Sequence, residues 1–186
     1  MVAEIKEDEL VVEEIEKDQY LVFAVRSQEY AIHAMRVREI SRALGTSKVP
    51  TAPSYIEGIL NLRGQLATII NFRKKFGFET KDIDEDTRII IIEHSGFPIG
   101  ILVDSVEEVM KITDDKIQKL PEEASTTMSK EYITGVGMLE KKLIIMLDTD
   151  RLLSKGESLE VKAAIQAAEG MNSEQLRTII TKKEGT

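Results

Sequence analysis

Apolar residues in this chain are grouped in short runs that polar turns separate. The runs are rich in β-branched and aromatic residues, which favour strands. Several runs are apolar at consecutive positions, as expected for strands that curl around a core and bury both faces. Helical periodicity is scarce between residues 19 and 153, so the pattern predicts an all-β fold of small barrels. The predicted strands are Leu21–Val25, Tyr30–Ala34, Leu66–Ile70, Ile89–Ile92, Ile99–Val103 and Leu143–Leu147.

The hydrophobic pattern occurs twice along the chain. A shift of 77 positions places Tyr55–Ile59 on Tyr132–Val136, and without a gap it also places Leu66 on Leu143. Upstream, "YLVFAVRSQEYAIHAMRVREI" resembles "RIIIIEHSGFPIGILVDSVEEV", and both stretches end in a Val-x-Glu-Ile/Val segment. The simplest interpretation is an internal duplication of one small β unit. The two copies span roughly residues 19–81 and 87–153.

Short helices are expected directly after the repeated strands. Asn71 and Asp148 hold the same position in the two copies, and each follows a strand. Both side chains can accept a hydrogen bond from the free N–H groups of a first helical turn. We therefore predict that these residues are the N-caps of Phe72–Phe76 and Thr149–Leu153.

Residues 154–186 differ from the repeated body and predict a helical C-terminal extension. The segment Ser158–Glu169 is rich in alanine, leucine and glutamate, which favour a helix that Gly170 would end. A second helix is predicted from Asn172, where a glutamine three residues later completes a capping box. Its narrow apolar stripe consists of Leu176, Ile179 and Ile180.

Charge is distributed unevenly along the chain. Of the net −8 for 186 residues, residues 1–18 hold eight acidic residues and two lysines, net −6, which leaves −2 for the rest. The acidic N-terminal segment is predicted to be flexible, and it does not have the charge of a signal peptide. The nearly neutral body argues against nucleic acid as a partner. No apolar run reaches the ~20 residues of a membrane span, so no direct membrane insertion is expected.

Catalytic and metal-binding patterns are missing from the sequence. There is no cysteine, no glycine-rich phosphate loop and no nucleophile motif beside either histidine. His33 is interpreted as a strand residue and His94 as a turn residue. Asp148–Asp150 could be imagined to hold magnesium, but helix capping accounts for it better. We therefore expect a partner-binding module rather than an enzyme, with no cofactor and no metal.

The two copies differ at one hairpin tip. Asn61-Leu62-Arg63-Gly64 of the first copy aligns with Met138-Leu139-Glu140-Lys141 of the second, so only the leucine is shared. Glycine suits a turn with positive φ, yet a lysine serves at the aligned place. Drift of an exposed turn is one explanation. The other is that the first tip recognises a partner.

The order of these segments resembles the CheW family of chemotaxis coupling proteins. The likeness runs through "YIEGILNLRG", "GILVDSVEEVMKI" and "YITGVGMLEKKLIIMLDTDRLL" and covers about residues 19–153. The resemblance implies two packed, interlocked five-stranded SH3-like barrels without catalytic activity. It implies a cytoplasmic adaptor at membrane-associated chemoreceptor arrays. Its partners would be the helical hairpin at the cytoplasmic tip of a chemoreceptor and the regulatory domain of the histidine kinase CheA.

The resemblance also implies a set of partner-binding residues. Glu39 and Arg63 match the family's charged pair, and we expect these two side chains to lie within reach of each other. Val37 and Ile40 match apolar positions on the groove between the barrels, where a receptor helix would lie, although from the pattern alone both suit a core. The complete expected set is Leu21, Val37, Glu39, Ile40, Asn61, Leu62, Arg63 and Gly64.

Three alternatives share part of this pattern. A CheW-like domain of CheA would be accompanied by a phosphoacceptor helix and an ATP-binding domain, and one of CheV type by a receiver domain. Neither pattern occurs in these 186 residues. An SH3-like barrel could also bind RNA or a different protein. The lack of a basic surface with aromatic stacking residues argues against RNA.

Overall fold

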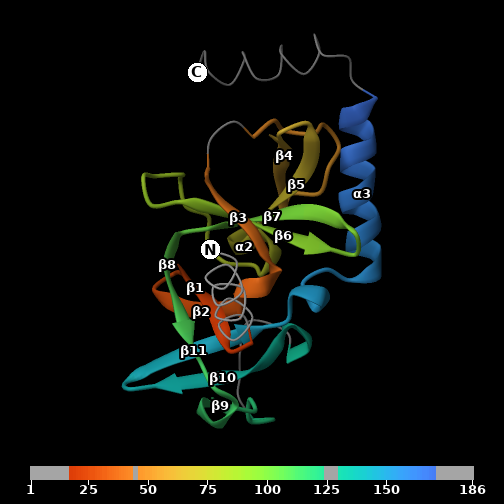
Figure 1. Ribbon diagram of the computed structural model, residues 1–186. Coiled ribbons are helices and arrows are strands. Elements are labelled where there is room, and N and C mark those ends of the chain that lie inside the picture. Colours follow the sequence, from red (N-terminus) through yellow and green to blue (C-terminus); the bar gives the residue numbers. More distant parts are fainter. Residues whose placement is uncertain (1–16, 44–45, 124–129, 171–186) are drawn as a thin grey trace, which may run out of the picture.

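The computed structural model describes residues 17–43, 46–123 and 130–170 and arranges their strands in two sheets (Figure 1). The two described α-helices are α2 (Phe72–Lys75) and α3 (Lys155–Glu169), and the all-β prediction is confirmed. All six predicted strands are present, within one to two residues of their predicted ends. The strands are β1 (Gln19–Val25), β2 (Gln28–His33), β3 (Val37–Arg42), β4 (Ile56–Leu62), β5 (Gln65–Asn71), β6 (Arg88–His94), β7 (Phe97–Val103), β8 (Ser105–Lys111), β9 (Ile117–Gln118), β10 (Ile133–Leu139) and β11 (Lys142–Leu147).

Each sheet combines strands from both sequence repeats. Sheet A has the order β8-β1-β2-β11-β10-β9, and sheet B has the order β3-β6-β7-β5-β4. The hairpin β1–β2 of the first repeat therefore lies among strands of the second, and β6–β7 lies among strands of the first. Parallel pairs, β2 with β11 and β5 with β7, join the two repeats within each sheet. Separating the repeats would break both sheets, so the predicted halves are sequence units and not folding units.

Strand pairing confirms the duplication residue by residue. Tyr55 and Tyr132 each precede an equivalent strand, and their carbonyls accept bonds from the amides of Asn71 and Asp148. The pairs β4–β5 and β10–β11 have the same register under the shift of 77 positions. A shift of 69 positions relates the pairing of β3 with β6 to that of β8 with β1. The two shifts differ by eight residues because the connection between these strands is eight residues longer in the second copy.

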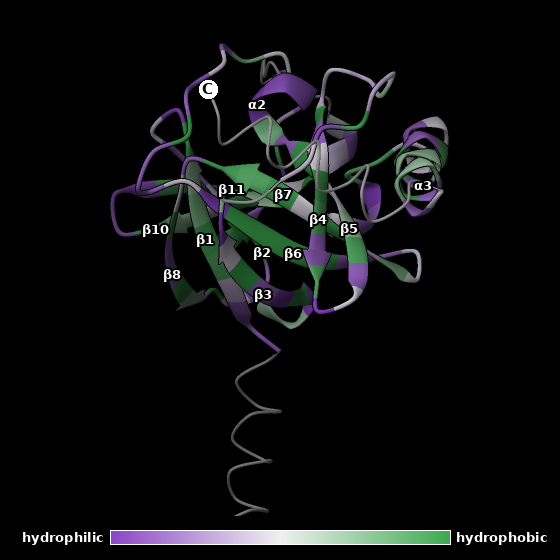
Figure 2. Ribbon diagram, turned by 90° about the horizontal axis from the view of Figure 1, so that it is seen from above, coloured by the Kyte–Doolittle hydropathy of each residue, from purple (hydrophilic) through white to green (hydrophobic). Residues whose placement is uncertain are grey.

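Three apolar clusters stabilise the two sheets. The largest combines residues of both sheets with one face of α3, and a smaller cluster lies on the opposite face of each sheet. The strands are therefore buried on both faces, which accounts for their uninterrupted apolar runs. In β6, for example, Ile90 and Ile92 belong to the large cluster, whereas Ile89 and Ile91 belong to the small cluster of sheet B. Figure 2 shows this concentration of hydrophobic residues in the strands.

Helix capping follows the sequence prediction, except at the start of α3. The side chains of Asn71 and Asp148 accept bonds from the amides of Lys74 and Asp150, as predicted. Gly170 ends α3, which starts earlier than predicted because Ser154 and Glu157 form a capping box. The second predicted C-terminal helix and the acidic segment, apart from residues 17 and 18, lie outside the described residues.

The prediction that His94 is a turn residue is wrong. His94 is the last residue of β6 and is only 3% exposed. Its ring nitrogens lie 3.3 Å from the Thr149 carbonyl oxygen and 3.2 Å from the Ser158 hydroxyl oxygen. The polar residue at the end of an apolar run is therefore a buried link to α3, which only the tertiary packing reveals. His33 lies in β2, as predicted.

In each sheet, a glycine allows a neighbouring backbone segment to approach a strand closely. Ser47 and Ile59 exchange two backbone hydrogen bonds beside Gly58, and a Cβ at Gly58 would lie 2.4 Å from the Ser47 carbonyl oxygen. In the second copy, a Cβ at Gly135 would lie 2.7 Å from the carbonyl oxygen of Gln118. The repeated glycine of "YIEG" and "YITG" is therefore required by close backbone approach.

Replacing Gly58 by alanine should destabilise the fold by about 2 kcal/mol or more, because backbone rather than a flexible side chain would have to move. Gly156 is the matched control, since the nearest atom to its added Cβ is the Ser154 hydroxyl oxygen at 4.0 Å and alanine favours its helix. Chemical denaturation would measure both. Equal stabilities for the two variants would contradict the closure argument.

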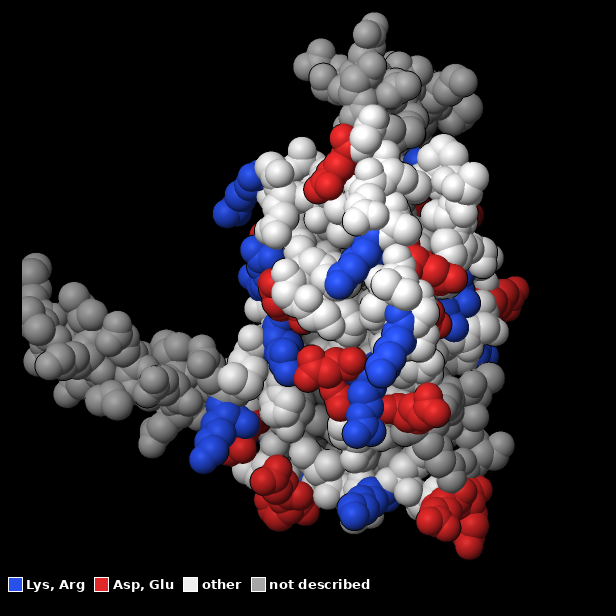
Figure 3. Space-filling model, turned by 90° about the vertical axis from the view of Figure 1, so that its right-hand side faces the viewer, with Lys and Arg blue, Asp and Glu red and all other residues white. Residues whose placement is uncertain are grey.

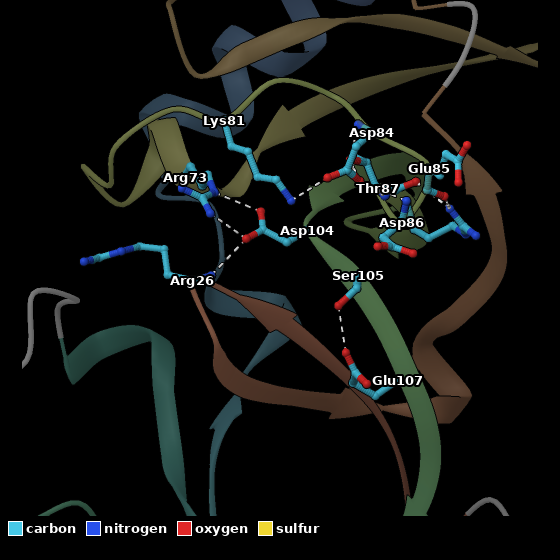
Figure 4. Close-up of polar contacts among 11 residues, drawn as sticks. Arg26, Arg73, Lys81, Asp84, Glu85, Asp86, Thr87, Asp104, Ser105 and Glu107 are labelled. Carbon is cyan, nitrogen blue, oxygen red and sulfur yellow. Dashed lines mark hydrogen bonds and ion pairs between the residues drawn. The ribbon is translucent and has the colours of Figure 1, made fainter.

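A charged contact joins the repeats beside sheet A (Figure 4). The Arg73 guanidinium donates two bonds to the Asp104 carboxylate, at 2.8 and 2.6 Å, and the Arg26 amide donates a third. Burial raises the pKa of Asp104, but the bonds from Arg73 and Arg26 outweigh it and hold this pKa below its ordinary value. Both side chains are largely buried, whereas the related pair of Arg36 and Asp150 is exposed.

We expect Asp104→Asn to lower the free energy of unfolding by about 2 kcal/mol near neutral pH. Because the folded pKa is depressed, this stabilisation is fully present above the unfolded pKa of about 4 and is lost as the pH falls through the folded pKa. The difference between the variant and the parent should thus shrink on acidification, as denaturation at several pH values would show. Asp150→Asn should cost less than about 1 kcal/mol. An equal cost for both variants would refute the argument.

Candidate partner-binding site

A β-bulge sets the direction of the candidate apolar residues on β3. Val37 lies opposite Ile92 and Ile40 lies opposite Ile90, with one extra residue on β3 between them. Because paired residues point to the same face, the bulge brings Val37 and Ile40 to one face although they are three positions apart. Val37 packs against the large cluster, while Ile40 is 44% exposed.

Val109 was missed as a candidate from the sequence. It holds the position on β8 that Ile40 holds on β3, since Val106 and Val109 lie opposite Phe23 and Leu21 across an equivalent bulge. Its side chain is 50% exposed. The aligned Val-x-Glu-Ile/Val segments contained the signal, because they relate Ile40 to Val109.

Glu39 and Arg63 do not pair with each other in this structure. Glu39 lies opposite Ile91 and therefore points to the other face of β3 from Ile40. Within the described ranges, neither Glu39 nor Arg63 forms an ion pair, so the expected contact between them is not formed. The strand β3 does approach this hairpin, but through the neighbouring Arg38, whose guanidinium donates to the Gln65 side-chain oxygen at 3.4 Å.

The tip of the β4–β5 hairpin has a conformation of its own. Arg63 and Gly64 both have positive φ, 52° and 94°, which is the arrangement of a type I′ turn. The Asn61 side chain accepts a bond of 2.8 Å from the Gly64 amide. In the second copy only Glu140 has positive φ, so Lys141 does not show that glycine is dispensable in the first tip. The turn accounts for Asn61 and Gly64, and it leaves the Arg63 side chain exposed and unexplained.

The remaining candidates are packing residues. Leu62 is half-buried and packs against the small cluster of sheet B. Leu21 is 3% exposed in the large cluster, so its side chain has no surface for a partner in this structure. The structure therefore brings Val37 and Ile40 together on one edge, whereas Arg63 lies at the hairpin tip without a contact to them.

Helix α3 is tied to sheet B beside this hairpin (Figures 1 and 2). The Thr68 hydroxyl donates to the Val161 carbonyl, and the Tyr55 hydroxyl donates to the Glu160 carboxylate. Burial and the Glu160 carboxylate both raise the pKa of Tyr55. On the face that carries α3, acidic and basic side chains are interspersed without a large area of one sign (Figure 3).

No group of three or more potential metal ligands occurs among the described residues. None of the described helices is long and apolar enough to cross a membrane. The observed arrangement of two interlocked small-barrel sheets, with exposed apolar edges and a charged tip, is that of a protein-binding scaffold.

Comparison with known proteins assigns the family. The model of the CheW-like domain matches residues 19–157, and the chain belongs to this family. A chemotaxis protein CheW of Klebsiella aerogenes is 36% identical over 121 residues, 65% of this chain and 72% of that protein. The CheW of Helicobacter pylori is 31% identical over 119 residues, 64% of this chain and 71% of that protein.

A solved structure supports the same assignment. The crystal structure of the scaffolding protein TtCheW from Thermoanaerobacter tengcongensis superposes with a TM-score of 0.69 at 32% identity, over 76% of this chain and 92% of that one. The fold is therefore two packed SH3-like barrels, as the sequence predicted. The chain is a scaffold protein of the chemotaxis signalling family.

Proposed function

We propose that this protein couples the cytoplasmic tips of chemoreceptors to the histidine kinase CheA, so that receptor state controls kinase activity. The observation that carries the proposal is the exposed Arg63, which a fixed turn presents and which forms no ion pair among the described residues. An arginine in this state can form bidentate contacts with a carboxylate of a partner. The relatives named CheW and the scaffold structure support this adaptor role.

The edge of β3 suits the receptor. The receptors that the CheW family binds have helical hairpins at their tips. An apolar edge is suited to the apolar stripe of such a helix. Val37 is half-buried and would contact the helix from beneath, and Ile40 is exposed and would contact it directly. Glu39, on the other face of β3, would contact a different partner or stabilise the edge.

The tip with Arg63 suits the regulatory domain of the kinase. Asn61 and Gly64 hold the turn, and Leu62 anchors it to the barrel interior. The backbone of the turn is thus fixed before binding, so only the Arg63 side chain has to be ordered by the partner. The proposal implies that the protein acts at receptor arrays on the cytoplasmic side of the membrane, without membrane insertion of its own.

Arg63→Ala should leave the melting temperature nearly unchanged, because an exposed side chain without an ion pair contributes little to stability. Its binding to the CheA regulatory domain or to a receptor fragment should weaken about tenfold or more, since a desolvated arginine contact is worth about 2 kcal/mol. Calorimetric titration and thermal unfolding would measure the two effects. Glu140→Ala is the matched control, because Glu140 holds the same repeat position with φ of 53°. Native binding of the Arg63 variant to both partners would count against the proposal.

Ile40→Glu should weaken binding of the receptor fragment about tenfold or more while the fold persists, because it places a carboxylate on the proposed apolar contact. Ile83→Glu is a control of similar exposure, 43% against 44%, on the connection between the repeats. The same titration serves for both variants. Equal affinities for the receptor fragment would remove Ile40 from the site.

A further inference from the structure

The hairpin β10–β11 presents an apolar pair that no described element covers. Met138 and Leu143 lie directly opposite each other and are 46% and 49% exposed. They are on the same face of sheet A as Ile145 and Leu147, which belong to or pack against the large cluster. The pair therefore continues the apolar face of sheet A outward into solvent.

The internal duplication shows what covers the equivalent face of sheet B. Asn61 and Leu66 hold the positions of Met138 and Leu143. There, α3 lies along β4 and β5, and Leu66 and Ile165 are both partly buried against the large cluster. The apolar stripe of α3 consists of Val161, Ala164 and Ala168, all buried.

Successive contacts give the direction of α3 along the hairpin. Glu157 pairs with Lys75, Glu160 accepts from Tyr55, and the carbonyl of Val161 accepts from Thr68. The helix thus starts beside the base of the hairpin and proceeds toward its tip. Its C-terminal end lies on the side of Leu66.

The first repeat has no helix equivalent to α3 in the described part of the chain. After α2, Phe78 packs against the large cluster, and residues 79–87 then connect to β6 without a helix. Sheet A therefore retains the shape of a helix-binding face. Its exposed pair, Met138 and Leu143, is more apolar than the equivalent pair of Asn61 and Leu66 in sheet B.

We propose that the face formed by Tyr132, Met138 and Leu143 binds an amphipathic helix of a partner protein, in the orientation that α3 has on sheet B. Tyr132 is the equivalent of Tyr55, and its hydroxyl donates to no described residue. A carboxylate placed as Glu160 is in α3 would accept this bond. At the other end, Lys141 lies at the tip of the hairpin, toward which the C-terminus of the helix would point, and a cation stabilises that end. The neighbouring Lys142 pairs with Glu29.

The preferred occupant is therefore a helix with small or branched residues along one stripe and a glutamate one position before that stripe. A suitable probe is a peptide with the sequence Lys155–Glu169, stapled between the exposed positions of Ala163 and Ala167 so that it is helical in isolation. The full chain, labelled at methionine and leucine methyl groups, would be titrated with it and followed by NMR. We expect saturable shifts at Met138 and Leu143.

Three variants test the details of this site. Leu143→Glu in the chain should weaken the peptide about tenfold or more, whereas Leu159→Glu, on the exposed side of α3, should bind as the parent does. A peptide with Glu160→Gln should bind more weakly than the parent peptide if its carboxylate meets Tyr132. Equal binding of the two peptides would overturn the proposed orientation.

Other outcomes would overturn the proposal as a whole. Shifts confined to other methyl groups, or no binding at millimolar peptide, would show that the face is not a helix site. Concentration-dependent dimers that Leu143→Glu abolishes would assign the face to a second copy of the chain. The titration contains neither receptor nor kinase, so its failure would leave the adaptor proposal untouched.

Discussion

Burial of one apolar cluster between two interlocked sheets is the interaction on which the rest of this structure depends. Each sheet needs strands of both repeats, so neither repeat can form its half of the cluster alone. At the junction, the ammonium group of Lys75 lies 5.7 and 5.1 Å from the ring centroids of Tyr55 and Tyr132, and 2.6 Å from the Glu157 carboxylate. The two tyrosines are equivalent residues of the repeat, so one cation is shared by both copies. Its buried position is tolerable because a counter-ion and aromatic faces replace water.

Helix α3 is the element that makes the two sheets unequal. It is bound to sheet B through Ser158, Glu160 and Val161. The partner of Glu160, Tyr55, has an equivalent tyrosine in the other copy, whereas the partners of Val161 and Ser158 are replaced there. The equivalent of Thr68 is Ile145, and the equivalent of His94 is Val25. A duplicated fold with one bound helix has one stabilised hairpin and one open face. The candidate site on β3 and the tip with Arg63 both belong to the sheet that α3 supports, which keeps their backbone fixed before a partner arrives.

Local sequence signals predicted the strands, the caps and the duplication, because branched apolar runs, capping side chains and repeated glycines act over a few residues. The resemblance to the CheW family led to Val37 and Ile40, although only the bulge shows why residues three apart share a face. The burial of His94 and the lack of an ion pair between Glu39 and Arg63 were not predictable in the same way. Both depend on how distant strands and α3 pack, and no local pattern encodes that packing. Likewise, the glycine of the first tip was undervalued, because aligned turns were assumed to share one conformation.

The duplicated frame allows two recognition surfaces of different chemistry on one rigid body. Where the first copy has Arg63 at its tip, the second has Glu140, with nearly the same φ. Where the first copy has Arg73, the second has Asp150. Arg73 pairs with Asp104 of the second copy, and Asp150 pairs with Arg36 of the first copy. Both partners lie at a connection between two strands. Conserving the backbone while reversing the charge preserves the fold, because either sign satisfies the same pairing geometry. It also makes the two ends unlike in charge, so a partner that complemented one end would be repelled at the other, and such repulsion is one source of specificity.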